Sequence, residues 1–287
     1  MTDQPTLVLG AVAYDPKVVT IWEGFKAYFE RHDLPFDYVL YSNYERQVEA
    51  LLDGQIHVAW NSPLAWVRAD RAARARGQMV EAIAMRDTDR DLASVIVVRA
   101  DAPFHTVADL RGRTVAVGAI DSPQATLIPL HELRRAGLTP EVDVTVQRHD
   151  LLGGKHGDHV GGEREAARAL VAGEADAACM IEGNYAAFQT DGALPAGATR
   201  VLARTAAYDH CNLTVGPAAP TELTERFRAL LLAMHYDDPE VRPLFDLEGL
   251  TAWCDGRVEG YRPLEAAVDE AGFYDARGEL IAAEYRF

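Results

Sequence analysis

The sequence predicts an α/β protein with two lobes, and three observations lead to that prediction. Short apolar runs alternate with amphipathic segments of helical period along the 287 residues. The same scheme starts again after about the first hundred residues, and strand-like segments near 92–99 and 207–216 connect the two halves. A chain of this length can bury two cores. We therefore expect lobe 1 to contain residues 1–95 and 212–287, and lobe 2 to contain residues 96–211.

The first lobe is expected to begin with three strand–helix pairs. The expected strands are 6–13, 36–42 and 56–62, and the amphipathic segments that follow them are 18–34, 44–55 and 63–77. Gly54 closes the second helix, and Pro63 suits the first turn of the third. Residues 81–86, 92–100 and 210–217 are further expected strands, and 222–236 and 262–273 are expected helices.

The second lobe is expected to repeat this alternation. Residues 106–138 contain, in order, a short helix, a Gly turn, a strand, a loop and a helix. Residues 143–150 form a strand, and 163–188 form a helix, a Gly turn, a buried strand and a loop. The β-branched residues of 198–205 indicate one more strand.

The composition excludes several classes of protein. The net charge of −16, from 44 acidic and 28 basic residues, disfavours binding to a phosphate backbone or to an anionic membrane surface. No run of about 18 apolar residues predicts a membrane span, and glycine-rich nucleotide-binding signatures are absent. Three cysteines at unrelated spacings do not suggest a disulfide framework.

The location of the protein is predicted from its first residues. "MTDQPTLVLGAVAYD" contains neither a basic segment nor an apolar run typical of a secretory signal. The sequence therefore predicts a cytoplasmic protein. A periplasmic protein or a lipoprotein would fit if a signal had been removed from the chain.

Three segments resemble the phosphate/phosphonate substrate-binding proteins of ABC transporters. These are "YERQVEALLDGQIHVAWNSPLAW", "TVADLRGRTVAVGAIDSPQATLIPLHELRRAGL" and "AARALVAGEADAACM". The resemblance covers roughly residues 6–235, and "DLRGRTVAVG" is its most specific part. It implies a type 2 periplasmic-binding fold, in which a hinge cleft separates two mixed α/β lobes. These motifs are signatures of a fold and not of a ligand.

Candidate ligand-binding residues follow the expected strands, because sites in open α/β sheets form at the carboxyl ends of strands. In lobe 1 they are Tyr14, Asp15, Ser42, Tyr44, Asn61 and Ser62; in lobe 2 they are Asp121, Ser122, Gln124, Ala125, Thr126 and Asn184; at the return crossing they are Asp209, His210 and Cys211.

The turn at "AIDSPQATLIP" has two interpretations. In the family this turn grips the phosphoryl oxygens of the ligand, which the resemblance carries over to Ser122, Gln124, Ala125 and Thr126. Asp121 and Pro123 depart from that pattern, because an aspartate repels an anion and a proline lacks an N–H donor. The alternative is plain N-capping of a helix by Asp121 or Ser122.

The segment "KHGDHVGGERE" (155–165) is the strongest candidate for a metal site. His156 and His159 are three residues apart, and Asp158 and Glu163 complete a possible set of ligands for a divalent transition metal. The spacing matches no recognised zinc signature. The alternatives are direct contact of the histidines with an organic ligand, or a solvated loop in which Glu163 caps the next helix. The cofactor is otherwise unknown.

Two functions remain open. In the first, the lobes close around a small anionic or zwitterionic metabolite that resembles a phosphonate, phosphate or carboxylate, and a transporter permease is the partner if the protein is exported. In the second, a cytoplasmic enzyme on the same fold uses His156, His159 and Glu182 as acid–base groups or metal ligands. A Cys211–His210 nucleophilic pair is disfavoured, because adjacent residues of an extended chain point to opposite faces.

Both functions predict the same result at one residue. Replacing His159 with Ala should weaken the binding of ligand or metal and barely change stability, which calorimetry and thermal unfolding would measure. Unchanged binding would contradict direct contact of His159 with what the protein binds.

Overall fold

The computed structural model describes residues 5–151, 153–156 and 162–287, and its contacts divide the chain into two compact units. Unit 1 consists of Met1–Arg90, Asp209–Tyr261 and Tyr274–Leu280, and unit 2 consists of Asp91–Tyr208, Arg262–Phe273 and Ile281–Phe287. The division differs from the expected one at the C-terminal end. The sequence placed all of 212–287 in lobe 1, whereas two of its segments pack into unit 2.

Unit 1 contains a six-stranded sheet in the order β11-β4-β10-β3-β1-β2. Its strands are β1 (Leu7–Val12), β2 (Phe36–Tyr41), β3 (Val58–Asn61), β4 (Glu81–Arg86), β10 (Asn212–Val215) and β11 (Trp253–Asp255). β1 pairs in parallel with β2 and β3, and β10 runs antiparallel between β3 and β4. The strand that returns at 212 is therefore inserted inside the sheet, between β3 and β4.

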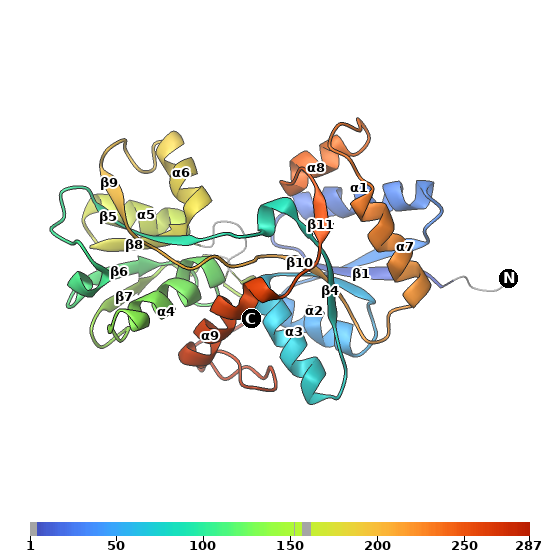
Figure 1. The fold of residues 1–287 in the computed structure, drawn as a ribbon, viewed down its shortest axis with the longest axis horizontal. Helices are drawn as coiled ribbons and strands as arrows, with labels where there is room; N and C mark the ends of the chain where they lie inside the picture. The colour runs from blue at the N-terminus through green and yellow to red at the C-terminus, as the bar shows by residue number, and fades with distance from the viewer. Residues whose placement is uncertain (1–4, 152, 157–161) are drawn as a thin grey trace. The chain divides into compact units, whose positions relative to one another are not determined.

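Helices cover both faces of this sheet (Figure 1). They are α1 (Lys17–Arg31), α7 (Thr221–Leu232) and α8 (Arg242–Glu248) on one face and α2 (Tyr44–Leu52) and α3 (Pro63–Ala75) on the other. Phe25 and Phe29 of α1 are fully buried and pack in one core with Phe227 of α7. Two short 3-10 helices, η1 (Asp87–Asp89) and η4 (Glu259–Tyr261), complete the unit.

Unit 2 contains a five-stranded sheet in the order β7-β6-β8-β5-β9. Its strands are β5 (Ser94–Arg99), β6 (Thr114–Val117), β7 (Thr145–Arg148), β8 (Ala177–Ile181) and β9 (Thr199–Arg204). β6 pairs in parallel with β7 and β8, whereas β5 is antiparallel to both of its neighbours. The strand expected at 92–100 is thus β5, an interior strand of the sheet that is buried on both faces.

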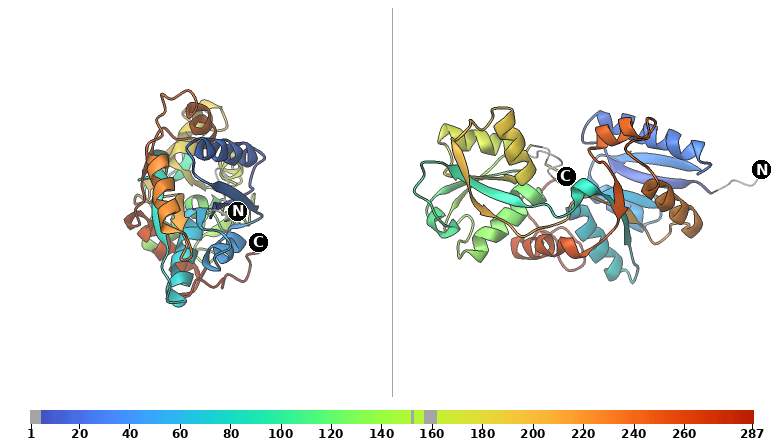
Figure 2. Two further views of the ribbon diagram at one scale, coloured as in Figure 1. Left: turned by 90° about the vertical axis from the view of Figure 1, so that its right-hand side faces the viewer. Right: turned by 45° about the horizontal axis from the view of Figure 1, so that its top comes forward.

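The side chains of β5 alternate between two cores. Val95 and Val97 pack in the core that includes α5 (Glu163–Ala172) and α6 (Glu182–Thr190). Ile96 and Val98 pack on the opposite face, in the core that includes α4 (Ile128–Arg135) and the 3-10 helix η2 (Val107–Leu110). The right-hand view of Figure 2 shows the green helix α4 and the yellow-green helix α5 on opposite sides of this sheet. The period of two along β5 places its residues on alternate faces.

The C-terminal helix α9 (Arg262–Ala271) packs on α4 in unit 2, where His131 Nδ1 lies 2.7 Å from Glu270 Oε2. A five-residue π-helical segment, η3 (Pro123–Leu127), leads into α4, where the sequence predicted only a turn before a helix. The predicted fold class of two mixed α/β lobes is confirmed. Among the helices of the described ranges, none has the length and apolarity required to span a membrane.

Gly162 provides a test of this packing. It has φ +88°, and a Cβ there would collide with the backbone oxygen of His149. Gly173 has a similar φ of +77°, but no atom lies within 4 Å of the place that a Cβ would take. The positive φ costs an alanine about 1–2 kcal/mol at either position, and the collision adds about 1–3 kcal/mol at Gly162 alone.

We therefore expect Gly162→Ala to lower the free energy of unfolding by more than Gly173→Ala, by an extra ~1–3 kcal/mol. Urea denaturation of the two variants measures the difference. Equal losses would show that the loop end at Gly162 is not held against His149.

Candidate functional site

The carboxyl ends of the parallel strands β6, β7 and β8 lie at one edge of the unit 2 sheet. The segments that follow these ends are the turn before α4, the loop that starts at His149, and helix α6. Most residues that the sequence nominated in lobe 2 therefore come from one sheet edge, as the rule for open α/β sheets predicts.

The turn at Ser122 is organised as a helix cap. Ser122 Oγ accepts a hydrogen bond from Ala125 N at 3.2 Å, and Ser122 O accepts one from Thr126 N at 3.1 Å. Pro123 stands in the first turn. The backbone donors of Ala125 and Thr126 are thus engaged within the turn, so the anion cradle predicted at these two residues is not formed by their N–H groups. The structure favours the capping interpretation there.

Asp121 is fully buried and holds the neighbouring loop. Its Oδ2 accepts hydrogen bonds from Gly154 N and His156 N, both at 2.8 Å. Burial raises the pKa of Asp121, and the nearby His156 opposes that rise. His156 is itself buried and adopts φ +52°, a conformation uncommon for a residue with a side chain. The side chain of Asp121 therefore ties the turn to the loop.

Glu163, at the start of α5, is fully buried beneath the same edge. Its Oε2 accepts from Asn184 Nδ2 at 2.8 Å and from Ile181 N at 3.0 Å, and the Gln124 side chain also hydrogen-bonds to this carboxyl group. Burial raises the pKa of Glu163 to about 8. A carboxyl group that is protonated at neutral pH is a poor metal ligand.

The structure therefore describes only two of the four predicted metal ligands. The Glu163 carboxyl accepts a hydrogen bond from the Asn184 side chain, and the backbone N–H of His156 donates to Asp121. The other two predicted ligands, Asp158 and His159, lie outside the described residues.

His149 is a residue that the sequence analysis missed. It directly follows β7, its N–H bonds to Val117 O at 3.2 Å, and its Nε2 is buried without a hydrogen-bond partner in the described structure. The signal was available, since His149 follows a strand end as directly as the residues that were nominated.

Glu182 has a different environment from the one predicted. It opens α6 at the surface, and both of its carboxylate oxygens accept from Arg204, at 2.8–3.1 Å. The side chains of both residues are half exposed. The acid–base role predicted for Glu182 has no support in this arrangement, because its carboxylate is committed to an arginine in solvent.

In unit 1, the nominated residues divide into structural and accessible groups. Asn61 is fully buried and donates to Thr214 Oγ1 and accepts from Gln47 Nε2, both at 2.9 Å. Ser62 caps α3 by accepting from Ala65 N. Tyr44 is 2% exposed at the start of α2 and packs in a cluster that includes residues of α3, so its ring has a structural role here.

Three unit 1 candidates remain at the ends of β1 and β2. Tyr14 is partly buried against the main core, with Lys17 Nζ 5.9 Å from its ring centre. Asp15 is exposed and accepts from Lys17 N at 2.8 Å, at the start of α1. Ser42 is exposed. Of these, Asp15 has a local role in the turn that leads into the helix.

Asp209 is committed to a buried ion pair. Its two carboxylate oxygens accept from Arg257 Nε at 2.6 Å and from Arg257 Nη2 at 2.5 Å, and its side chain is fully buried. A two-pronged guanidinium–carboxylate pair leaves little capacity for another partner. The predicted contact of Asp209 with a ligand is therefore not supported.

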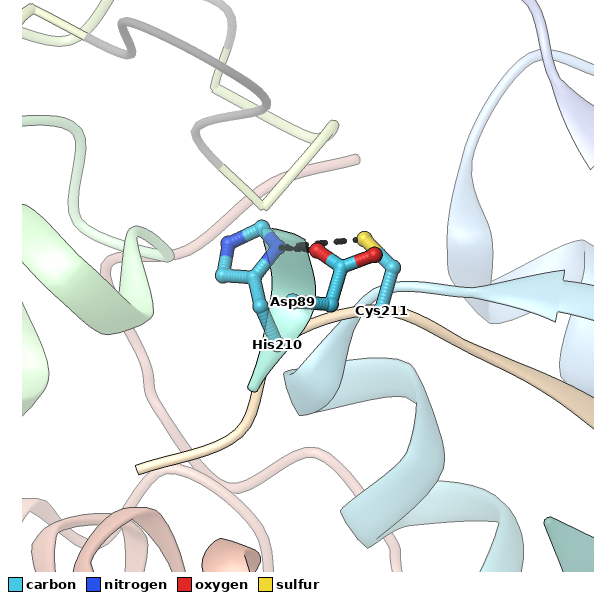
Figure 3. A group of neighbouring side chains, drawn as sticks. All are labelled: Asp89, His210 and Cys211. Atoms are coloured by element: carbon cyan, nitrogen blue, oxygen red, sulfur yellow. Dashed lines mark hydrogen bonds and ion pairs between the residues drawn. The ribbon is translucent and has the colours of Figure 1, made fainter. Parts of the chain in front are cut away.

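His210 and Cys211 converge with Asp89 (Figure 3). His210 Nδ1 lies 3.1 Å from Cys211 Sγ and 3.4 Å from Asp89 Oδ1, and one ligand atom from each of the three residues lies within 4.8 Å of the others. All three side chains are buried. The sequence nominated two members of this group but not Asp89, which is distant along the chain.

Arg86 is the main partner of Asp89 in this group. It donates to both oxygens of Asp89, at 2.5 and 2.9 Å, and stacks 5.1 Å from the ring centre of Trp60. The guanidinium lowers the pKa of Asp89, and burial opposes that effect. A metal ion would have to displace this buried cation, so the group is better described as a buried ion-pair network.

Three solved structures of similar fold are informative. PhnD1 from Prochlorococcus marinus, in complex with methylphosphonate, is 15% identical, with 93% of this chain and 98% of that chain covered at a TM-score of 0.69. A binding protein component of an ABC phosphonate transporter from Pseudomonas aeruginosa is 14% identical, with 96% and 92% covered and a TM-score of 0.60. The periplasmic aliphatic sulphonate binding protein SsuA from Escherichia coli is 17% identical, with 96% and 92% covered and a TM-score of 0.57. At these identities the likeness establishes the fold.

The family itself is established by a sequence model. Residues 11–261 match the model described as ABC transporter, phosphonate, periplasmic substrate-binding protein. This match corrects the cytoplasmic location predicted above, which rested only on the first fifteen residues, whereas the family is periplasmic. It confirms the resemblance seen in the three sequence segments. The chain belongs to the phosphonate family of periplasmic substrate-binding proteins of ABC transporters.

Proposed function

We propose that the protein binds a small organic anion of the phosphonate class in the periplasm and delivers it to the permease of an ABC transporter. The observation that carries this proposal is the family match over residues 11–261. The similar structure described with methylphosphonate supports the choice of ligand class. The comparisons give no support to the alternative of an enzyme.

The buried carboxyl groups of unit 2 are compatible with an anion. Burial raises the pKa of both Asp121 and Glu163, the latter to about 8. A protonated carboxyl group carries no charge to repel an anion and can donate a hydrogen bond. The objection that the sequence raised against Asp121 is therefore weakened by its burial.

His149 and Ser122 are the donors that we propose for the ligand at this edge. The buried Nε2 of His149 has no partner among the described residues, and burying a polar atom without a partner is costly. Ser122 Oγ accepts from Ala125 N and keeps its own proton for donation. Ser122, His149 and the backbone around His156 come from segments that follow neighbouring parallel strands.

We expect methylphosphonate to bind to the protein with a measurable heat, and His149→Ala to weaken that binding about tenfold or more, the loss of one hydrogen bond to a charged group. Isothermal titration with methylphosphonate, methanesulfonate and inorganic phosphate tests the ligand class. His105→Ala is the matched control, because His105 is an exposed histidine of the same unit.

Absence of binding for all three anions would contradict the proposed function. If the wild type binds and His149→Ala binds equally well, the function stands and the proposed place of His149 is wrong.

The raised pKa of Glu163 predicts a pH dependence of stability. The unfolded chain ionises this residue near its ordinary value of 4.5, whereas the folded protein keeps the proton until about pH 8. Between these values the folded state binds more protons, so its stability falls as the pH rises from 4.5 to 8 and changes no further through this group above that.

Glu163→Gln keeps the hydrogen-bonding shape and cannot ionise. Urea denaturation at about pH 5, 7 and 9 should show a smaller loss of stability with rising pH in this variant than in the wild type. Glu165→Gln, the next acidic residue on α5, controls for a general effect of charge, because Glu165 pairs with Arg168 at the surface. Parallel pH profiles for wild type and Glu163→Gln would show that Glu163 is already ionised in the folded protein.

A further inference from the structure

Unit 2 contains a cavity of about 250 Å³ that lies on the α4 side of its sheet. Every residue that lines it belongs to unit 2. Its walls come from α4, β7, the end of α9, and the C-terminal residues 282–284. The residues proposed above to bind the phosphonate, Ser122 and His149, do not line this cavity. The cavity shares Thr126 with the turn before α4, but it is lined by neither of the two side chains proposed above as donors to the phosphonate.

The wall formed by the C-terminal segment is fixed by three contacts. Glu284 Oε2 accepts from Arg148 Nη1 of β7 at 2.7 Å. The ring of Tyr285 lies 5.0 Å from that of Phe273, just after α9. Ile281 N also bonds to Phe273 O at 3.0 Å. The cavity is thus enclosed by a segment that is anchored at both its sides.

Most of the lining is apolar, but it contains two buried polar atoms without partners. Leu127, Leu130 and Phe273 are among the apolar side chains. Thr126 is 2% exposed, and its Oγ1 has no hydrogen-bond partner within the described ranges. Arg134 Nη1 is buried and equally unpartnered there. Unpaired buried polar atoms are rare in folded proteins, and a bound molecule is one of the few explanations for them.

Arg134 differs from the other charged residues of the lining. Arg148 has two acidic partners, Glu284 at 2.7 Å and Glu141 at 3.6 Å. In the part of the chain that the structure describes, Arg134 forms no ion pair, although a guanidinium that is half buried gains most from a carboxylate. The two arginines and two glutamates of the lining balance in charge, but both glutamates pair with Arg148, and Arg134 is left for a ligand.

We propose that this cavity is a second ligand site, which takes a small monocarboxylate with a hydrocarbon body. The carboxylate pairs with Arg134, and the hydrocarbon chain lies on Leu127, Leu130 and Phe273. The volume corresponds to about eight groups of the size of a water molecule. This matches a carboxylate with about six carbons in all and its two oxygens. A dianionic phosphate fits poorly, because Glu141 and Glu284 line the same space and the walls are apolar.

Hexanoate is the probe, titrated against the full chain by ligand-observed NMR up to about ten millimolar, a range suited to weak affinities. We expect saturable binding that weakens at least tenfold in Arg134→Gln. Arg135→Gln is the matched control, because Arg135 neighbours Arg134 on α4, is exposed and does not line the cavity. Thermal unfolding of each variant verifies that the fold is retained.

Two further variants test the cavity and leave the charge of Arg134 unchanged. Leu130→Trp fills the space and should abolish hexanoate binding. Thr126→Val removes the Thr126 hydroxyl, which would be the partner of a hydroxyl on the ligand. It should therefore weaken the binding of 6-hydroxyhexanoate more than that of hexanoate. The titration is repeated with saturating methylphosphonate, which should leave hexanoate binding unchanged.

Three results would overturn the proposal. The first is no saturable binding, which would assign the two polar atoms to water. The second is equal weakening by Arg134→Gln and Arg135→Gln, which indicates attraction by charge alone. The third is displacement of hexanoate by methylphosphonate, which would place the carboxylate at the phosphonate site. The first two results do not depend on whether methylphosphonate itself binds, so a failure of this proposal and a failure of the proposed function can be told apart.

Discussion

The constraint on which the structure depends is that helices cover both faces of both sheets. β5 shows this most clearly, because four consecutive residues, Val95 to Val98, are fully buried on alternate faces. Apolar burial of this kind supplies the main driving force for folding, and it excludes polar side chains from the middle of the strands. Polar groups are therefore concentrated at strand ends, and chemistry is possible only there or between helices.

The sequence was sufficient to predict the fold, because its strands are apolar runs of normal length and its helices are amphipathic and closed by glycines. The helix of 262–273 shows where this reasoning ends. Its amphipathic pattern predicts a helix, and it is one, but a pattern of period 3.6 does not name the surface on which the apolar face packs. α9 packs on α4 in unit 2, a contact more than a hundred residues away along the chain.

The candidate site was harder to predict, and the reason is the double use of polar residues at strand ends. Asn61, Ser62 and Asp209 follow the rule for a ligand site, yet the structure uses them for a buried network, a helix cap and an ion pair. Sequence position places a side chain at an edge, but it does not say which partner the side chain finds. Conversely, His149 was not nominated, because the sequence showed no partner for it, although it follows a strand as directly as the residues that were. The carboxyl of Asp121 was judged only as a charge, and the sequence does not show the burial that raises its pKa.

The path of the chain between the units has a consequence for how the protein is made. The backbone changes from one unit to the other after residues 90, 208, 261, 273 and 280, so neither unit is a continuous piece of chain. Unit 1 lacks β10 until residues 212–215 are present, and unit 2 lacks α9 and the segment that encloses its cavity until the last residues are present. Domains usually fold in order as the ribosome extends the chain, N-terminal parts first. Here both cores remain incomplete until segments beyond residue 261 have been made, so a chain cut before α9 would contain no finished unit.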